Sequence, residues 1–136
     1  MNDHSHQVRV RIYHEDTDAG GVVYHANYLR YMERARTEWL EATGFDHDRV
    51  EREWGVLFVV RAIDVAFLRP ARLGDTLQAV AELGEVRHGL MIFRQRVLRQ
   101  EQVLVRAKVT VVCVHAADFT LAPVPEVLLH VLGVKG

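Results

Sequence analysis

An aspartate followed by two glycines and the start of a helix is the feature of this sequence best suited to chemistry. Asp18 stands two residues before the pair Gly20 and Gly21, and a helical pattern begins near His25. Glycine adopts backbone angles that other residues avoid, so the chain can turn tightly here. The first turn of a helix has free N–H groups and the positive end of the helix dipole. A carboxylate held beside that end could act on a carbonyl group that the amides polarise.

Each of these residues also has an ordinary structural interpretation. Asp-Ala-Gly-Gly is a good turn sequence, in which the aspartate side chain only bonds its own backbone. Glu15 and Asp16 could form a carboxylate cluster with Asp18, but neighbouring acidic residues are more often solvated. His25 could contact a substrate carbonyl, or it could be a polar surface residue. The pattern alone leaves both interpretations open.

Other chemistries find little support in the sequence. Ser5 is the only serine and lies in the polar N-terminal segment, so a serine nucleophile is not expected. His4 and His6 form a pair in the same segment, and no His-Glu-x-x-His or Cys-x-x-Cys spacing occurs, so no metal site is expected. Phosphate-binding glycine motifs are absent as well. Arginines such as Arg61 and Arg69 could hold a phosphate, or could simply solubilise the rim of a sheet.

The composition predicts one ordinary globular domain over residues 1–136. The chain is 49% hydrophobic and 26% charged, which is typical of a protein with a real core. Its 17 basic and 18 acidic residues give a net charge of −1, so no overall field attracts nucleic acid or anionic lipid. No apolar run reaches the roughly 20 residues that span a bilayer, and residues 1–7 do not resemble a secretory signal. We expect a cytoplasmic protein, in which the single cysteine, Cys113, is buried and inert.

The hydrophobic periodicity predicts a strand, a long helix, a short helix and then four strands. The long helix should end at Gly44, and the short one should be capped by Asp46 and end at Gly55. Residues 1–7 should form a polar tail, and residues 126–136 a C-terminal tail that is either a short helix or irregular. Strands are expected at 8–13, 56–68, 76–87, 90–100 and 103–115, and helices at 27–43 and 46–54.

Short breaks between the last four strands predict antiparallel connections, and hence an α+β architecture. The strand at 103–115 alternates apolar and polar residues, so the sheet has an apolar face that the long helix can cover. One helix does not obviously cover both faces or both edges of such a sheet. Self-association, most simply as a two-fold dimer that continues the sheet, is therefore expected.

The sequence resembles the Tol-Pal-associated acyl-CoA thioesterases, a branch of the 4-hydroxybenzoyl-CoA thioesterase group of hotdog folds. The similarity extends from about residue 8 to residue 125, and its first string is the most specific. The strings that carry it are EDTDAGGVVYHANY at 15–28, ERARTE at 33–38, FVVR at 58–61, ARLGD at 71–75 and VVCV at 111–114. The resemblance implies the hotdog fold, a long central helix wrapped by a five-stranded antiparallel sheet, which agrees with the element order expected from periodicity.

The resemblance also implies a function and a site. Asp18 would be the essential carboxylate, and the backbone N–H of His25 would donate to the oxyanion while its side chain positions the substrate. The active site would lie at a dimer interface of a homodimer or homotetramer. The substrate would be an acyl thioester of CoA or of acyl carrier protein, with no separate cofactor. The residues expected to contact it are Gly21, Val22, Tyr24, Arg61 and Arg69. His14 stands where relatives often have a tyrosine, so a phenolic contribution there is in doubt.

Several points stay open at this level. Asp18 could attack the thioester to form a mixed anhydride, or act as a general base on water. A hotdog hydratase or dehydratase, and a non-catalytic acyl-CoA binding or scaffolding domain, are the alternative functions. Acyl specificity is not readable from the sequence. The large side chains that could line the acyl pocket are Phe58, Phe67, Met91 and Phe93.

Overall fold

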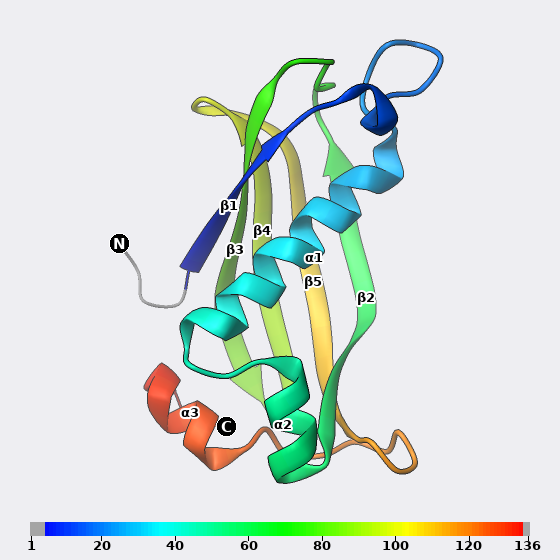
Figure 1. Ribbon diagram of the computed structural model, residues 1–136. Coiled ribbons are helices and arrows are strands. Elements are labelled where there is room, and N and C mark those ends of the chain that lie inside the picture. The colour runs from blue at the N-terminus through cyan, green and yellow to red at the C-terminus, as the bar shows by residue number, and fades with distance from the viewer. Residues whose placement is uncertain (1–4, 135–136) are drawn as a thin grey trace.

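A long helix, α1 (His25–Ala42), lies diagonally across one face of a five-stranded antiparallel sheet (Figure 1). The computed structural model describes residues 5–134. The strands follow the order β1-β3-β4-β5-β2 across the sheet, so β1 and β2 are its edges. The other elements are β1 (Ser5–Arg11), the 3-10 turn η1 (His14–Asp16), α2 (His47–Trp54), β2 (Val56–Phe67), β3 (Thr76–Arg87), β4 (Leu90–Arg99), β5 (Gln102–His115) and α3 (Glu126–Leu132).

The core lies between α1 and the sheet. One face of the helix is apolar at spacings of three and four residues, and this face is buried against β1, β3 and β4. Trp39 meets Phe93 of β4 edge to face, with ring centroids 4.9 Å apart. Gln95, the one buried polar residue of the described part, is 1% exposed. The helix residues buried in this layer are Tyr28, Tyr31, Met32, Ala35, Trp39 and Leu40.

The ends of the helices follow the local signals in the sequence. Gly44 has a φ of +96° just beyond the end of α1. The Asp46 carboxylate accepts a hydrogen bond of 2.7 Å from the Arg49 N–H and so caps α2. Gly55 ends that helix with a φ of +66°, in the left-handed region that favours glycine. The predicted helix boundaries are confirmed to within two residues.

The prediction for the N-terminal segment needs correction. Residues 5–7 are not a polar tail but the start of β1, where Ser5, His6 and Gln7 pair with Glu82, Ala81 and Val80 of β3. Backbone hydrogen bonds hold this edge segment in the sheet although its side chains lack an apolar alternation. His4 lies outside the described residues. Of the two alternatives expected for the C-terminal segment, the structure has the short helix, α3, whose Leu128 and Leu132 are buried.

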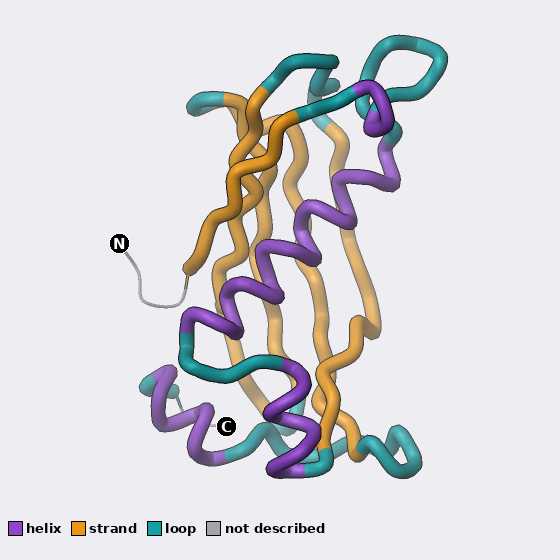
Figure 2. Tube along the Cα trace, in the orientation of Figure 1, coloured by secondary structure: helices purple, strands orange, loops and turns teal. Residues whose placement is uncertain are grey.

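The loops at 17–24 and 68–75, which carry Asp18, Gly21, Val22, Tyr24 and Arg69, lie at the same end of the molecule. The loop at 17–24, the loop at 68–75 and the hairpin between β4 and β5 are all at this end (Figure 2).

Cys113 is fully buried, and burial raises the pKa of its thiol to about 11. The predicted inert cysteine therefore fits its position. No helix among the described residues is long and apolar enough to cross a membrane.

Candidate active site

The loop between η1 and α1 is a tight hairpin that holds Asp18 at its turn. Thr17 and Val23 form an isolated antiparallel bridge across it. The Asp18 N–H donates to the Val22 carbonyl at 2.9 Å, and the Gly21 N–H donates to the Asp18 carbonyl at 3.0 Å. Gly21 has a φ of +80°, which explains why glycine stands there. The hairpin projects beyond the N-terminal end of α1 (Figure 1).

The Asp18 carboxylate is oriented by the same turn. Its Oδ1 accepts a hydrogen bond of 2.8 Å from the Gly20 N–H, as expected for an aspartate that bonds its own turn. Within residues 5–134 its other oxygen, Oδ2, has no hydrogen-bond donor. A Cβ atom at Gly20 would lie 3.2 Å from Oδ1, so the glycine leaves room for the carboxylate. The structural and the chemical interpretations are thus compatible, because the turn fixes one oxygen and leaves the other exposed.

The start of α1 presents free backbone donors. Tyr24 is the N-cap residue and makes no side-chain capping bond, while the Asn27 N–H donates to the Tyr24 carbonyl at 2.8 Å. Among the described residues, the N–H groups of His25 and Ala26 have no hydrogen-bond acceptor. An 18-residue helix also has its positive dipole end here. The end of α1 can therefore stabilise negative charge on a bound oxygen.

Hydrogen bonds fix this helix end against the hairpin. The Asp16 carbonyl accepts from the Tyr24 N–H at 3.0 Å and from the Asn27 side chain at 2.9 Å. The hairpin is joined in turn to the loop at 68–75, because the Val23 N–H donates to the Ala71 carbonyl at 2.9 Å. The Ala71 N–H donates to the buried Tyr28 hydroxyl at 2.9 Å. The positions of the carboxylate and of the helix amides are thus set by one connected network.

A small hollow of about 250 Å³ lies beside His25, between the start of α1 and the end of β2. The His25 ring is 4.7 Å from the Tyr24 ring and 5.8 Å from the Phe67 ring, measured between centroids. Arg69 lies at this hollow, and its contact with a substrate stays a prediction. The hollow is lined by Val23, His25, Tyr28, Phe67, Leu68, Arg69 and Pro70.

The predicted site residues are therefore not all brought together in one protomer. Asp18, Gly21, Val22 and Tyr24 lie in the hairpin or at the helix start. Arg61 lies apart from them, in the middle of β2 at the register shift between Val60 and Ala62, and it is exposed on the edge of the sheet. It is about 20 Å along the strand from Phe67, at 3.3 Å per residue.

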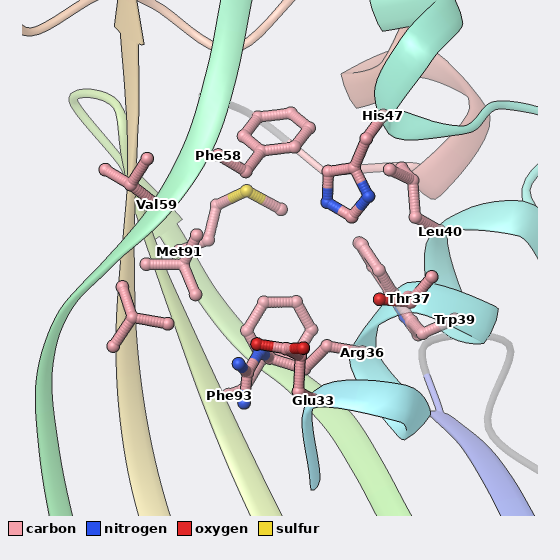
Figure 3. Close-up of a pocket in the computed structure, with 12 residues that line it drawn as sticks. Glu33, Arg36, Thr37, Trp39, Leu40, His47, Phe58, Val59, Met91 and Phe93 are labelled. Atoms are coloured by element: carbon pink, nitrogen blue, oxygen red, sulfur yellow. The ribbon is translucent and has the colours of Figure 1, made fainter. Parts of the chain in front are cut away.

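A larger hollow of about 470 Å³, here called the α1–β2 hollow, opens at the other end of β2 (Figure 3). It lies between the second half of α1, the start of α2 and the sheet. Of the large side chains that could line an acyl pocket, Phe58, Met91 and Phe93 line this hollow, whereas Phe67 lines the one beside His25. The lining residues are Glu33, Arg36, Thr37, Trp39, Leu40, His47, Phe58, Val59, Val60, Met91, Phe93 and Val111.

Comparison with known proteins identifies the family. Residues 12–132 match the model of the thioesterase-like superfamily. The chain belongs to this superfamily. The acyl-CoA thioesterase YbgC of Haemophilus influenzae is 42% identical to it over 114 residues, which is 84% of each chain. The acyl-CoA thioester hydrolase YbgC of Escherichia coli O6:H1 is 47% identical over 106 residues, 77% of this chain and 78% of that protein.

Solved structures of the superfamily have the same architecture. A probable thioesterase from Bartonella henselae superposes with a TM-score of 0.83 at 32% identity, covering 89% of this chain and 99% of that one. A hypothetical protein from Thermus thermophilus superposes with a TM-score of 0.86 at 31% identity, covering 94% and 97%. These similarities confirm the predicted hotdog fold, and membership of the superfamily confirms the predicted kind of enzyme, a thioesterase.

Proposed function

We propose that this protein hydrolyses acyl-CoA thioesters to the free acid and CoA, with Asp18 as the catalytic carboxylate. The observation that carries the proposal is the position of Asp18 in a glycine turn that leads into α1, with one carboxylate oxygen fixed by the Gly20 N–H at 2.8 Å. The acyl-CoA substrates named for the YbgC relatives support the same chemistry. Assignment to the Tol-Pal-associated branch, acyl carrier protein as a thioester donor, and a cytoplasmic location stay predictions.

In this mechanism the N–H groups at the start of α1 donate hydrogen bonds to the thioester oxygen. The oxygen gains negative charge when the acyl carbon is attacked, and amides aimed at it typically contribute on the order of 100-fold to 1,000-fold in rate each. The His25 N–H is the proposed donor, and the His25 ring, packed beside Phe67, positions the acyl group. Asp18 supplies either the attacking oxygen or the base that deprotonates water.

We further propose that the site is completed by a two-fold partner along β2. This strand is an edge of the sheet and exposes the apolar side chains Val60, Ile63 and Phe67. Two-fold pairing would set two β2 strands antiparallel, with the C-terminal end of one beside the N-terminal end of the other. His25 and Phe67 of one protomer would then adjoin the α1–β2 hollow of its partner. Such a dimer would join the carboxylate and the amides of one chain to the larger cavity of the other.

The test is thiol release from acyl-CoA by Asp18→Asn. The substitution keeps the size of the side chain and removes its charge, so kcat/KM should fall by about 100-fold or more. Glu15→Gln, an exposed carboxylate three residues earlier, is the matched control and should keep the parent rate. Parent activity in Asp18→Asn would refute the assignment. Turnover of enoyl-CoA without thiol release would instead indicate a hydratase.

Single-turnover hydrolysis in ¹⁸O-labelled water tests the nucleophilic role of Asp18. A carboxylate nucleophile forms a mixed anhydride and releases the CoA thiol, and label enters the Asp18 side chain when water then attacks the aspartyl carbonyl. Water that attacks the acyl carbon, of the anhydride or of the thioester, puts label in the product acid alone, so label in Asp18 would establish the nucleophile and exclude direct attack by water on the thioester.

A further inference from the structure

Arg36 is a half-buried cation on the wall of the α1–β2 hollow. Its guanidinium Nη1 donates a hydrogen bond of 2.8 Å to Gln95 Oε1. Gln95 is 1% exposed, and its Nε2 donates to the Met32 carbonyl at 3.0 Å. Figure 3 shows Arg36 beside Phe93 and Glu33 at the same cavity. A neutral amide therefore holds the guanidinium, and the amide is itself fixed to the helix backbone.

The charge of Arg36 has no close counterion within residues 5–134. No carboxylate oxygen of this part of the chain lies within 4 Å of its guanidinium nitrogens. Burial lowers the pKa of this guanidinium, while the charge of Glu33, exposed one turn earlier, acts in the opposite direction. A half-buried guanidinium without a bound anion is less favourable than an ion-paired one, because its partial desolvation is not offset by an ion pair. The hydrogen bond to Gln95 uses one of the five N–H donors of Arg36, so the other N–H groups can donate to a ligand.

The rest of the hollow is suited to a short carbon chain. Trp39, Leu40, Phe58, Met91 and Phe93 provide large apolar surfaces, and the volume of about 470 Å³ is in the range of small-molecule sites. Glu33, Thr37 and His47 also line the hollow, and among its lining residues Arg36 is the permanent cation. A mainly apolar cavity with such a cation selects ligands by the polar group that they carry at the matching position. A planar guanidinium is suited to a carboxylate, which it can bind through two parallel hydrogen bonds.

We infer that Arg36 is a specificity-determining residue that binds a second carboxylate at the far end of the acyl group. The inference rests on the proposed function and names its substrate class, the CoA monothioesters of short dicarboxylic acids. The thioester would lie at Asp18 and His25 of one protomer, and the distal carboxylate at Arg36 of its partner. Glu33 opposes this binding, since its negative charge lies at the same cavity.

The experiment compares adipoyl-CoA with hexanoyl-CoA, which have the same number of acyl carbons and differ at the far end. The parent protein should hydrolyse adipoyl-CoA with the higher kcat/KM. Arg36→Met keeps the length of the side chain and removes its charge, and should lower the ratio of the two kcat/KM values by about tenfold to 100-fold, the range for a hydrogen bond to a charged group. Arg36→Lys should retain part of the preference, and Glu33→Gln should raise the ratio by a few fold.

The ratio is insensitive to a general loss of folded protein, because both substrates report on the same sample. Arg30→Met is the control, an exposed arginine of α1 that does not line the hollow. A parent ratio of one or less, or an Arg36→Met protein that loses both activities equally, would overturn the inference while leaving thioester hydrolysis intact. Absence of thiol release from both substrates, in a screen of other acyl-CoAs as well, would instead refute the proposed function and this inference with it.

Discussion

Two buried tyrosines on α1 should respond differently to loss of the hydroxyl group. Tyr28 is 3% exposed and Tyr31 is 1% exposed, and their rings are 6.2 Å apart. The Tyr28 hydroxyl accepts a hydrogen bond from the fully buried Ala71 N–H at 2.9 Å. The Tyr31 hydroxyl has no hydrogen-bond partner in the described part of the chain. Burial, and then the nearby Asp16 carboxylate, raise the pKa of Tyr31.

Tyr28→Phe should therefore lower the free energy of unfolding by about 1 to 3 kcal/mol, the cost of a buried amide left without an acceptor. For a chain of this length that is a decrease in Tm of roughly 4 °C per kcal/mol. Tyr31→Phe removes a hydroxyl that lies near the Asp16 carboxylate but has no hydrogen-bond partner among the described residues, so the free energy of unfolding should change by less than about 1 kcal/mol. Urea unfolding at one fixed protein concentration measures both. Equal destabilisation by the two substitutions would refute the assignment of these hydrogen bonds.

Two further predictions concern the turn of the hairpin and the loop at 68–75. Gly20→Ala places a methyl group 3.2 Å from the Asp18 carboxylate and so disturbs its orientation. The kcat/KM should fall roughly threefold to tenfold, while Tm stays the same or rises slightly. A destabilised protein that keeps the parent kcat/KM would contradict this prediction. Burial would raise the pKa of Asp75, but hydrogen bonds from the Arg72 N–H and the Arg99 guanidinium outweigh it, and the pKa is lowered. A carboxyl with a lowered pKa stabilises the fold above its unfolded pKa of about 3.9 and loses this contribution as pH falls through the folded value. The stability difference between the parent and Asp75→Asn should thus be larger at pH 6 than at pH 3, and a difference independent of pH would contradict the assignment.

Local signals in the sequence are sufficient for most of the fold. The spacing of apolar residues in α1, the Asp46 cap and the left-handed Gly55 act within a few residues, and the structure has each of them where predicted. The start of β1 was missed because an edge strand is held by backbone pairing, which the side chains of Ser5 and His6 do not reveal. Side-chain periodicity therefore locates strands best where one face is buried.

Only one half of the candidate site, the hairpin with Asp18 and the start of α1, was predictable from the sequence. The hairpin with Asp18 and the start of α1 are contiguous in sequence, so a turn followed by a helix indicated them. The α1–β2 hollow depends on contacts across the chain, such as the bond between Arg36 and Gln95, which are 59 residues apart. Arg36 belongs to the ERARTE string, and the sequence alone predicts a surface position on an amphipathic helix for it. Only packing against β4 places its guanidinium at an apolar cavity.

The exposure of Asp18 in one protomer connects the proposed chemistry to assembly. A carboxylate and helix amides that stay open to water stabilise an oxyanion less well than the same groups in a closed site, because solvent screens them. The hollow beside His25 is small, and the larger apolar cavity lies at the opposite end of β2. A partner along β2 would supply both the cover and the cavity at once. The edge strand would thereby serve two purposes, since pairing removes an exposed sheet edge and encloses the site in the same step.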